Sequence, residues 1–123
     1  MENPDKDKAG LRRIWNAFGY SLDGFRAAYR HEEAFRQEIL LAALLIPLAL
    51  WLPVGGMGKA LMIASVLLVI VVELVNSAIE ATVDRISLDR DDLAKRAKDT
   101  GSAAVLASLV NVLVVWSLVL AAN

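Results

Sequence analysis

Apolar residues are grouped in long blocks along this chain of 123 residues. Residues 39–52 are apolar without interruption, residues 59–83 are apolar over most of their length, and residues 102–122 carry no charged side chain. A helix of about 20 residues is as long as the hydrocarbon core of a bilayer is thick. The first block reaches this length when it is extended back to Glu32, because charged side chains at a helix end can extend to the interface. The pattern therefore predicts an all-α membrane protein with a single domain and three spans, at 32–52, 59–83 and 102–122.

Before the first block, large apolar residues recur at steps of three and four. They are Leu11, Ile14, Trp15, Phe18, Leu22, Phe25 and Tyr29. This spacing places them on one face of a helix, and the spans that follow favour a helix lying at the membrane surface. We therefore predict an amphipathic surface helix at 11–30, with a soluble helix packed on a core as the alternative. The polar, mixed-charge residues 1–10 are predicted to be a disordered lead-in.

Two polar segments separate the spans. The sequence Pro-Val-Gly-Gly-Met-Gly at 53–58 predicts a turn. Residues 84–101 carry ten charged side chains and are predicted to be a loop, with a short helix at 88–98 as an alternative. Of the thirteen Lys and Arg residues, seven precede Ile39 and five lie between 84 and 100. The positive-inside rule then predicts a cytoplasmic N-terminus, a cytoplasmic loop at 84–101 and a C-terminus outside.

Composition narrows the function classes. Hydrophobic residues make up 57% of the chain, and the mean hydropathy is +0.50; with the residues gathered in blocks, this is typical of a membrane protein. The formal net charge of −1 provides no basic stripe for nucleic acid. The absence of cysteine excludes disulfides, thiolate nucleophiles and cysteine-based metal sites.

The second span carries a stripe of polar side chains on one helix face. Its members are Glu73, Asn76, Ser77, Glu80 and Asp84, at offsets of three, four, seven and eleven residues. An ionised side chain within a span costs several kcal/mol, so it indicates a functional site with a partner or ion nearby. Glu80 and Asp84 fall at the cytoplasmic end of the span, and Glu73 lies about 10 Å deeper.

These residue types suit phosphoryl transfer. Clustered carboxylates are ligands that Mg²⁺ shares with substrate phosphates, and a deep glutamate such as Glu73 is a candidate general base. The nearby basic residues can counter phosphate charge; they are Arg13, Arg85, Arg96 and Lys98. An ion or proton path, or helix association, accounts equally well for a polar stripe on a span. No nucleotide-binding motif of soluble kinases is present.

Four blocks of sequence resemble the bacterial integral-membrane diacylglycerol kinases. The strongest is Glu73-Leu-Val-Asn76-Ser77-Ala-Ile-Glu80-Ala-Thr-Val-Asp84-Arg85, where the family reads E-x-x-N-[ST]-A-I-E-x-x-V-D. The others are Gly19-Tyr20-Ser21 with Gly24-Phe25-Arg26-Ala27-Ala28, then Glu32-Glu33-Ala34-Phe35-Arg36-Gln37-Glu38, and finally Ala97-Lys98-Asp99-Thr100-Gly101-Ser102. The blocks follow one another in the family's order and cover nearly the whole chain. The lipid that accepts the phosphate remains open, because the related undecaprenol kinases use the same machinery to phosphorylate a polyprenyl alcohol. An alternative from another functional class is a subunit that transports protons or ions.

The resemblance implies a homotrimer in the bacterial inner (cytoplasmic) membrane, with active sites shared between subunits, that transfers the γ-phosphate of ATP to diacylglycerol with Mg²⁺ as cofactor. It implies Glu73 as catalytic base, Glu32 and Glu80 as metal ligands, and Asn76 in a supporting role. The implied ATP-binding residues are Arg13, Tyr20, Glu32, Glu80, Asp89, Arg90, Asp91, Lys98 and Asp99. The implied lipid-binding residues are Arg13, Ala17, Phe18, Gly19, Tyr20, Ser21, Leu22, Arg26, Ala27, Ala28, Tyr29, Ala34, Phe35, Arg36, Gln37, Glu38, Trp51, Lys59 and Ser102.

Overall fold

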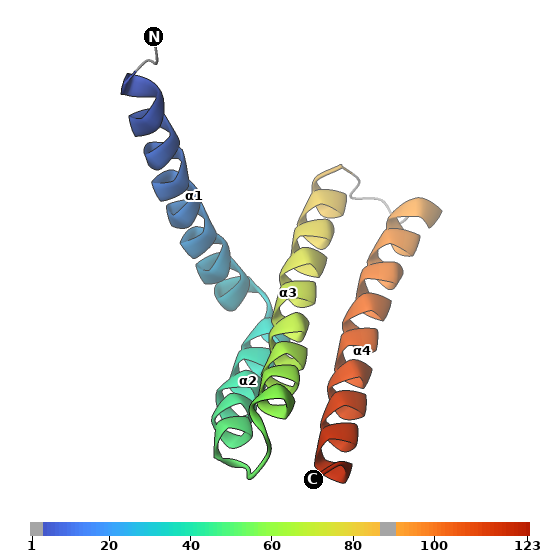
Figure 1. Cartoon of the computed structure of the whole chain (residues 1–123). Coiled ribbons are helices and arrows are strands. Elements are labelled where there is room, and N and C mark those ends of the chain that lie inside the picture. Colours follow the sequence, from blue (N-terminus) through green and yellow to red (C-terminus); the bar gives the residue numbers. More distant parts are fainter. Residues whose placement is uncertain (1–3, 87–90) are drawn as a thin grey trace.

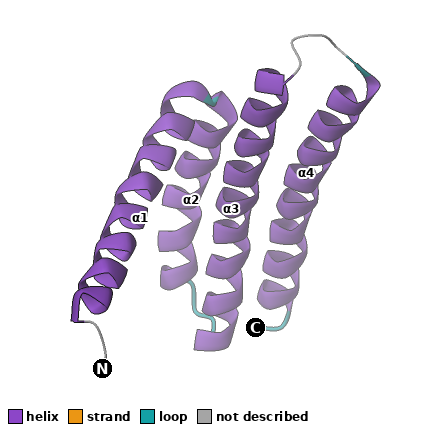
Figure 2. Cartoon of the chain, turned by 90° about the horizontal axis from the view of Figure 1, so that it is seen from above, coloured by secondary structure: helices purple, strands orange, loops and turns teal. Residues whose placement is uncertain are grey.

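The computed structural model describes residues 4–86 and 91–123, and all of their regular structure is helical (Figures 1 and 2). The four helices are α1 (Pro4–His31), α2 (Glu33–Trp51), α3 (Gly56–Ile86) and α4 (Asp92–Ala121). The predicted all-α class is confirmed. The helices α2, α3 and α4 are each long and apolar enough to cross a membrane, as the three apolar blocks predict.

The first two breaks between helices have local causes. Glu32 has an extended backbone (φ −114°, ψ 108°), so the chain changes direction between α1 and α2. At the end of α2, the amide of Leu52 still donates to the carbonyl of Leu48, and Pro53 then stops the helix because it has no amide hydrogen to donate. The Lys59 ammonium donates to the carbonyl of Leu50, which satisfies one of the free acceptors at the C-terminus of α2.

The helices extend beyond several of the predicted boundaries. The helix α3 includes residues 56–58 of the predicted turn and continues to Ile86, past the span end predicted at 83. The helix α1 begins at Pro4, so residues 4–10 are helical where a disordered lead-in was predicted. Proline is well accommodated in a first helical turn, where its missing amide hydrogen would have no partner.

The helix α4 begins at Asp92, so residues 92–101, predicted as a loop, are its first turns, and the alternative prediction of a short helix at 88–98 is correct for residues 92–98. The Asp91 carboxylate caps α4 by accepting a hydrogen bond from the amide of Ala94 at 2.6 Å, and the pair Lys95–Asp99 at 2.6 Å supports the next turn. Residues 87–90 of the predicted loop lie outside the described residues.

The helix α3 is the centre of the packing. It contacts α2 on one side and α4 on the other, and among the described helices α4 packs only on α3 (Figure 1). Small side chains such as Ala42, Ala49 and Ser108 are buried where the helices meet, which allows the close approach that packing in lipid requires. The large apolar residues of α3 and α4 that face no other helix of the chain stay exposed, as expected for helices surrounded by lipid.

The helix α1 leans away from the other three and contacts α2 and α3 through its C-terminal part (Figure 1). Ala28 is the one buried residue of 9–31, and all seven large apolar residues predicted to share a face of this helix are exposed. The exposed face is compatible with the predicted surface helix, which remains a prediction.

Candidate active site

Two glutamates face each other across the interface between α2 and α3. Glu73 on α3 is 3% exposed and Glu38 on α2 is 9% exposed, and the two side chains are close enough to share a hydrogen bond. One buried Glu38 carboxyl oxygen has no hydrogen-bond partner among the described residues. Two buried carboxyls side by side are stable only if they share a proton or attract a cation. The pair therefore creates a site that accepts protons or positive charge inside the bundle.

A second carboxyl pair lies closer to the cytoplasmic end predicted for α3. Glu80 lies one turn beyond Asn76, whose amide nitrogen donates to the Glu80 carboxylate at 3.3 Å. Glu32, at the junction of α1 and α2, is close enough to interact electrostatically with both Glu80 and Glu73. The chain thus brings four predicted site residues into one acidic cluster, which we define as Glu32, Glu38, Glu73 and Glu80.

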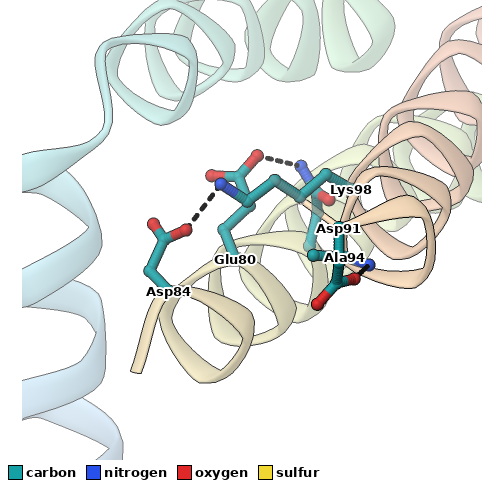
Figure 3. A network of polar contacts seen from close by, with 6 residues as sticks. Glu80, Asp84, Asp91, Ala94 and Lys98 are labelled. Atoms are coloured by element: carbon teal, nitrogen blue, oxygen red, sulfur yellow. Dashed lines mark hydrogen bonds and ion pairs between the residues drawn. The ribbon is translucent and has the colours of Figure 1, made fainter. Parts of the chain in front are cut away.

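A lysine from α4 reaches the edge of this cluster. Lys98 forms an ion pair with Asp84 at 2.5 Å, and it also lies within electrostatic range of Glu80 (Figure 3). The pair joins the C-terminal end of α3 to the N-terminal end of α4. The side chains of Lys98 and Asp84 are 44% and 59% exposed. An ion pair with this exposure contributes at most about 1 kcal/mol to stability. The lysine is therefore free to exchange its partner for another anion at small cost.

A groove borders the acidic cluster on its α1 side. It has a volume of about 680 Å³ and lies between the C-terminal half of α1 and the Leu74–Ala81 stretch of α3. Its lining residues are Ser21, Gly24, Phe25, Ala27, Ala28, His31, Glu32, Leu74, Ser77, Ala78 and Ala81. The lining is mostly apolar, with Glu32 at its polar end, so it suits an amphiphile whose polar group meets the carboxylates.

The remaining predicted lipid-binding residues separate into groups. Arg26, Tyr29 and Phe35 line a second groove, of about 400 Å³, in the elbow between α1 and α2. The Arg36 guanidinium donates to the Tyr29 carbonyl at 2.7 Å and so fixes that elbow. Trp51 and Lys59 lie at the opposite end of the bundle, and the structure does not bring them to the acidic cluster.

Several predicted nucleotide-binding residues are not brought to the cluster either. Arg13 and Tyr20 are exposed on the outer part of α1. Asp99 pairs with Lys95 on the surface, and Asp91 is the N-cap of α4. Asp89 and Arg90 lie outside the described residues, and Ser102 is exposed on α4.

Two features of the site went unassigned at the sequence level. Asp84 was recognised only as a member of the polar stripe, and its pairing with Lys98 requires the packing of α4 on α3. Glu38 was expected to approach the level of the other acidic groups from the first span and was assigned to lipid binding by resemblance, but its interaction with Glu73 was not predicted. Its burial within an apolar helix was the signal that could have linked it to the deep glutamate.

The carboxylates of the acidic cluster suit a metal ion that also binds a substrate. Within residues 4–86 and 91–123, no group of three or more Asp, Glu or His side chains is arranged to hold a metal ion alone. Glu32 and Glu80 offer two carboxylates near each other, and Mg²⁺ is commonly held by one or two carboxylates with phosphates and water completing its shell. The residues present therefore fit a magnesium ion that arrives with a phosphate ligand.

Comparison with known proteins gives a consistent result. Residues 19–120 match the sequence model of a family described as prokaryotic diacylglycerol kinase. A protein named diacylglycerol kinase from Pseudomonas aeruginosa (strain PAO1) is 56% identical over 118 residues, which cover 96% of each chain. A protein of the same name from Escherichia coli (strain K12) is 48% identical over 90% of this chain and 91% of the relative. Another, from Helicobacter pylori (strain 26695), is 41% identical over 94% of this chain and 90% of the relative.

Proposed function

The chain belongs to the prokaryotic diacylglycerol kinase family, and from this membership and the acidic cluster we propose that it phosphorylates diacylglycerol with ATP. The observation that supports the proposal best is the position of Glu73, which is buried in an apolar helix beside a groove suited to an amphiphile. In the proposed reaction the primary hydroxyl oxygen of diacylglycerol forms a bond to the γ-phosphorus of ATP. The bond between the γ-phosphorus and the β–γ bridging oxygen breaks, and phosphatidate and ADP leave.

Glu73 is the proposed general base. Its carboxylate takes the proton of the acceptor hydroxyl as the oxygen attacks phosphorus. The neighbouring Glu38 carboxyl holds the Glu73 side chain in place through their contact. A base buried in the bundle keeps bulk water from competing with the lipid hydroxyl.

Glu32 and Glu80 are proposed to hold the magnesium ion that accompanies ATP. When bound, the ion neutralises the negative charge of the transferring phosphoryl group. The Asn76 amide orients the Glu80 carboxylate by donating to it, and Lys98, from the α4 side, offers a positive charge to the phosphates. The nucleotide contacts of Arg13, Tyr20, Asp89, Arg90, Asp91 and Asp99 remain predictions that rest on resemblance.

The proposed setting is the bacterial inner membrane, with the N-terminus cytoplasmic and the C-terminus outside. The end of α3 with Asp84 and the beginning of α4 lie at the same end of the bundle, and the basic residues concentrate there. A homotrimer is proposed as well. Because α4 packs only on α3 within the described part of the chain, large apolar residues of α4 such as Leu106, Leu113 and Leu118 remain available to lipid or to a second copy.

A side-by-side assay tests the proposed reaction. The full chain, purified in detergent, is given [γ-³²P]ATP with diacylglycerol or with undecaprenol in mixed micelles, and the labelled lipid is quantified. We expect magnesium-dependent labelling of diacylglycerol at a rate well above that of undecaprenol. Preferential labelling of undecaprenol would reassign the acceptor. Proton or cation flux through liposomes without ATP consumption would instead support the transport alternative.

The Asp84–Lys98 pair yields a prediction for nucleotide binding. In Asp84→Asn, Lys98 loses the partner on α3 that positions it, so we expect the KM for MgATP to rise about three- to tenfold, with little change in thermal stability because the pair is exposed. Asp84→Glu, which keeps the charge, should restore most of the affinity. Steady-state kinetics at varied MgATP measures the effect, and an identical KM in all three proteins would contradict a role for the pair.

A further inference from the structure

The closest approach of α4 to the candidate active site is made by Gly101. This residue is buried, and a Cβ built at its position would overlap the side-chain amide oxygen of Asn76 and lie 3.2 Å from the amide carbon. The overlap involves a polar residue of the acidic site on a neighbouring helix. A contact of this kind leaves no room for any side chain other than the hydrogen of glycine at position 101.

Asn76 cannot easily move away from this contact. Its amide nitrogen donates to the Glu80 carboxylate at 3.3 Å, and a carboxylate can accept only from the nitrogen end of the amide. The oxygen end must then point toward α4, where it is buried without a hydrogen-bond partner among the described residues. The side chain is 7% exposed, so the space around it is filled. Asn76 is thus held between Glu80 and the backbone of Gly101.

We propose that Gly101 is a positioning residue for the Asn76–Glu80 pair. By lacking a side chain, it lets α4 pack closely enough on α3 to fix the Asn76 amide in the orientation that presents Glu80 to the magnesium-nucleotide site. This inference rests on the proposed function, because Glu80 is assigned there to metal and nucleotide. Gly101 touches neither substrate and acts only through Asn76.

A second crowded glycine provides a matched control. A Cβ at Gly58 on α3 would lie 2.9 Å from Cγ1 of Val119 on α4 and 3.6 Å from Cβ of Val54. Gly58 therefore also lies in a close contact between α3 and α4, although a less severe one than at Gly101, and its neighbours are apolar side chains at the end of the bundle away from the acidic cluster. A purely structural role for interhelical glycines predicts the same behaviour for both positions.

The first experiment compares Gly101→Ala with Gly58→Ala in the full chain. We expect Gly101→Ala to lower kcat/KM for MgATP about tenfold or more, because displacements near 1 Å in an active site are costly, while the KM for diacylglycerol changes less than about twofold. We expect Gly58→Ala to lower only the thermal midpoint, with kinetics within about twofold of the parent. Parent-like kinetics in Gly101→Ala, or an equal loss in both variants, would overturn the proposal.

The second experiment adds Asn76→Ala, which vacates the space that a Cβ at position 101 needs. If Gly101 acts through Asn76, Gly101→Ala has no further effect on activity or on the thermal midpoint in the Asn76→Ala background. This double variant remains informative if Gly101→Ala alone fails to fold. A further tenfold loss in the double variant would show that Gly101 acts by another route. If the parent protein has no kinase activity, the proposed function is wrong. The effects of Gly101→Ala and Asn76→Ala on the thermal midpoint, alone and combined, then still test the contact between Gly101 and Asn76.

Discussion

Glu73→Gln is expected to abolish phosphoryl transfer while leaving the protein folded. Glutamine has nearly the same shape as glutamate and can still hydrogen-bond to Glu38, so the interface between α2 and α3 should survive. It cannot accept the proton of the acceptor hydroxyl. Loss of a general base typically lowers a rate by about 10²- to 10⁴-fold. The measurement is kcat with saturating MgATP and diacylglycerol in mixed micelles.

The control for this variant is Glu33→Gln, the same chemical change on the exposed side of the first turn of α2. It should leave kcat within about twofold of the parent, since surface substitutions seldom disturb a site. Binding of MgATP to Glu73→Gln and its thermal midpoint should also match the parent, because the substitution removes a proton acceptor and no nucleotide ligand. Full activity of Glu73→Gln would remove the proposed base and with it the reason for a buried carboxyl at this depth.

Hydropathy alone located the three spans because lipid imposes a simple requirement. A helix that crosses the bilayer needs an apolar run of fixed length, and α2 at Glu33–Trp51 begins and ends within one residue of the span predicted at 32–52. The polar stripe on α3 was also visible in the sequence, because helical periodicity determines which residues share a face. Hydropathy and helical periodicity are properties of a single helix, so they do not depend on how the helices pack.

The arrangement of the site depends on how helices are rotated and shifted against one another, and no single-helix pattern contains that information. The sequence could not show that Glu38 of α2 meets Glu73 of α3, or that Lys98 of α4 pairs with Asp84. The same holds for Gly101, whose importance appears only through its contact with Asn76. The early start of α4 was missed for a different reason, since the charges that suggested a loop are compatible with an exposed, capped helix.

The acidic cluster has an unbalanced charge, and this imbalance favours the binding of a cation. Four glutamates from α2, α3 and the junction before α2 interact with one another, while Lys98 is the one cation that approaches Glu80 within the described part of the chain. Like charges that are partly withdrawn from water repel strongly. A divalent ion bound with ATP would relieve this repulsion, so metal and nucleotide binding should be coupled through Glu32 and Glu80, the carboxylates nearest the end of α3 that is proposed to be cytoplasmic.

Glu80→Ala is therefore expected to weaken the binding of metal and nucleotide together. Removing one of two carboxylate ligands should raise the KM for MgATP and the magnesium concentration for half-maximal rate by about tenfold or more, as loss of a ligand usually does. Glu33→Ala is the matched control, because Glu33 is exposed beside the site and outside the cluster. The rate is measured against magnesium concentration at fixed ATP. Glu73 keeps its role in this variant, so the rate should partly recover at high magnesium and ATP, whereas no recovery is expected for Glu73→Gln. A magnesium dependence identical to that of the parent would exclude Glu80 as a metal ligand, and a loss that saturating MgATP cannot reverse would move Glu80 from binding to the chemical step.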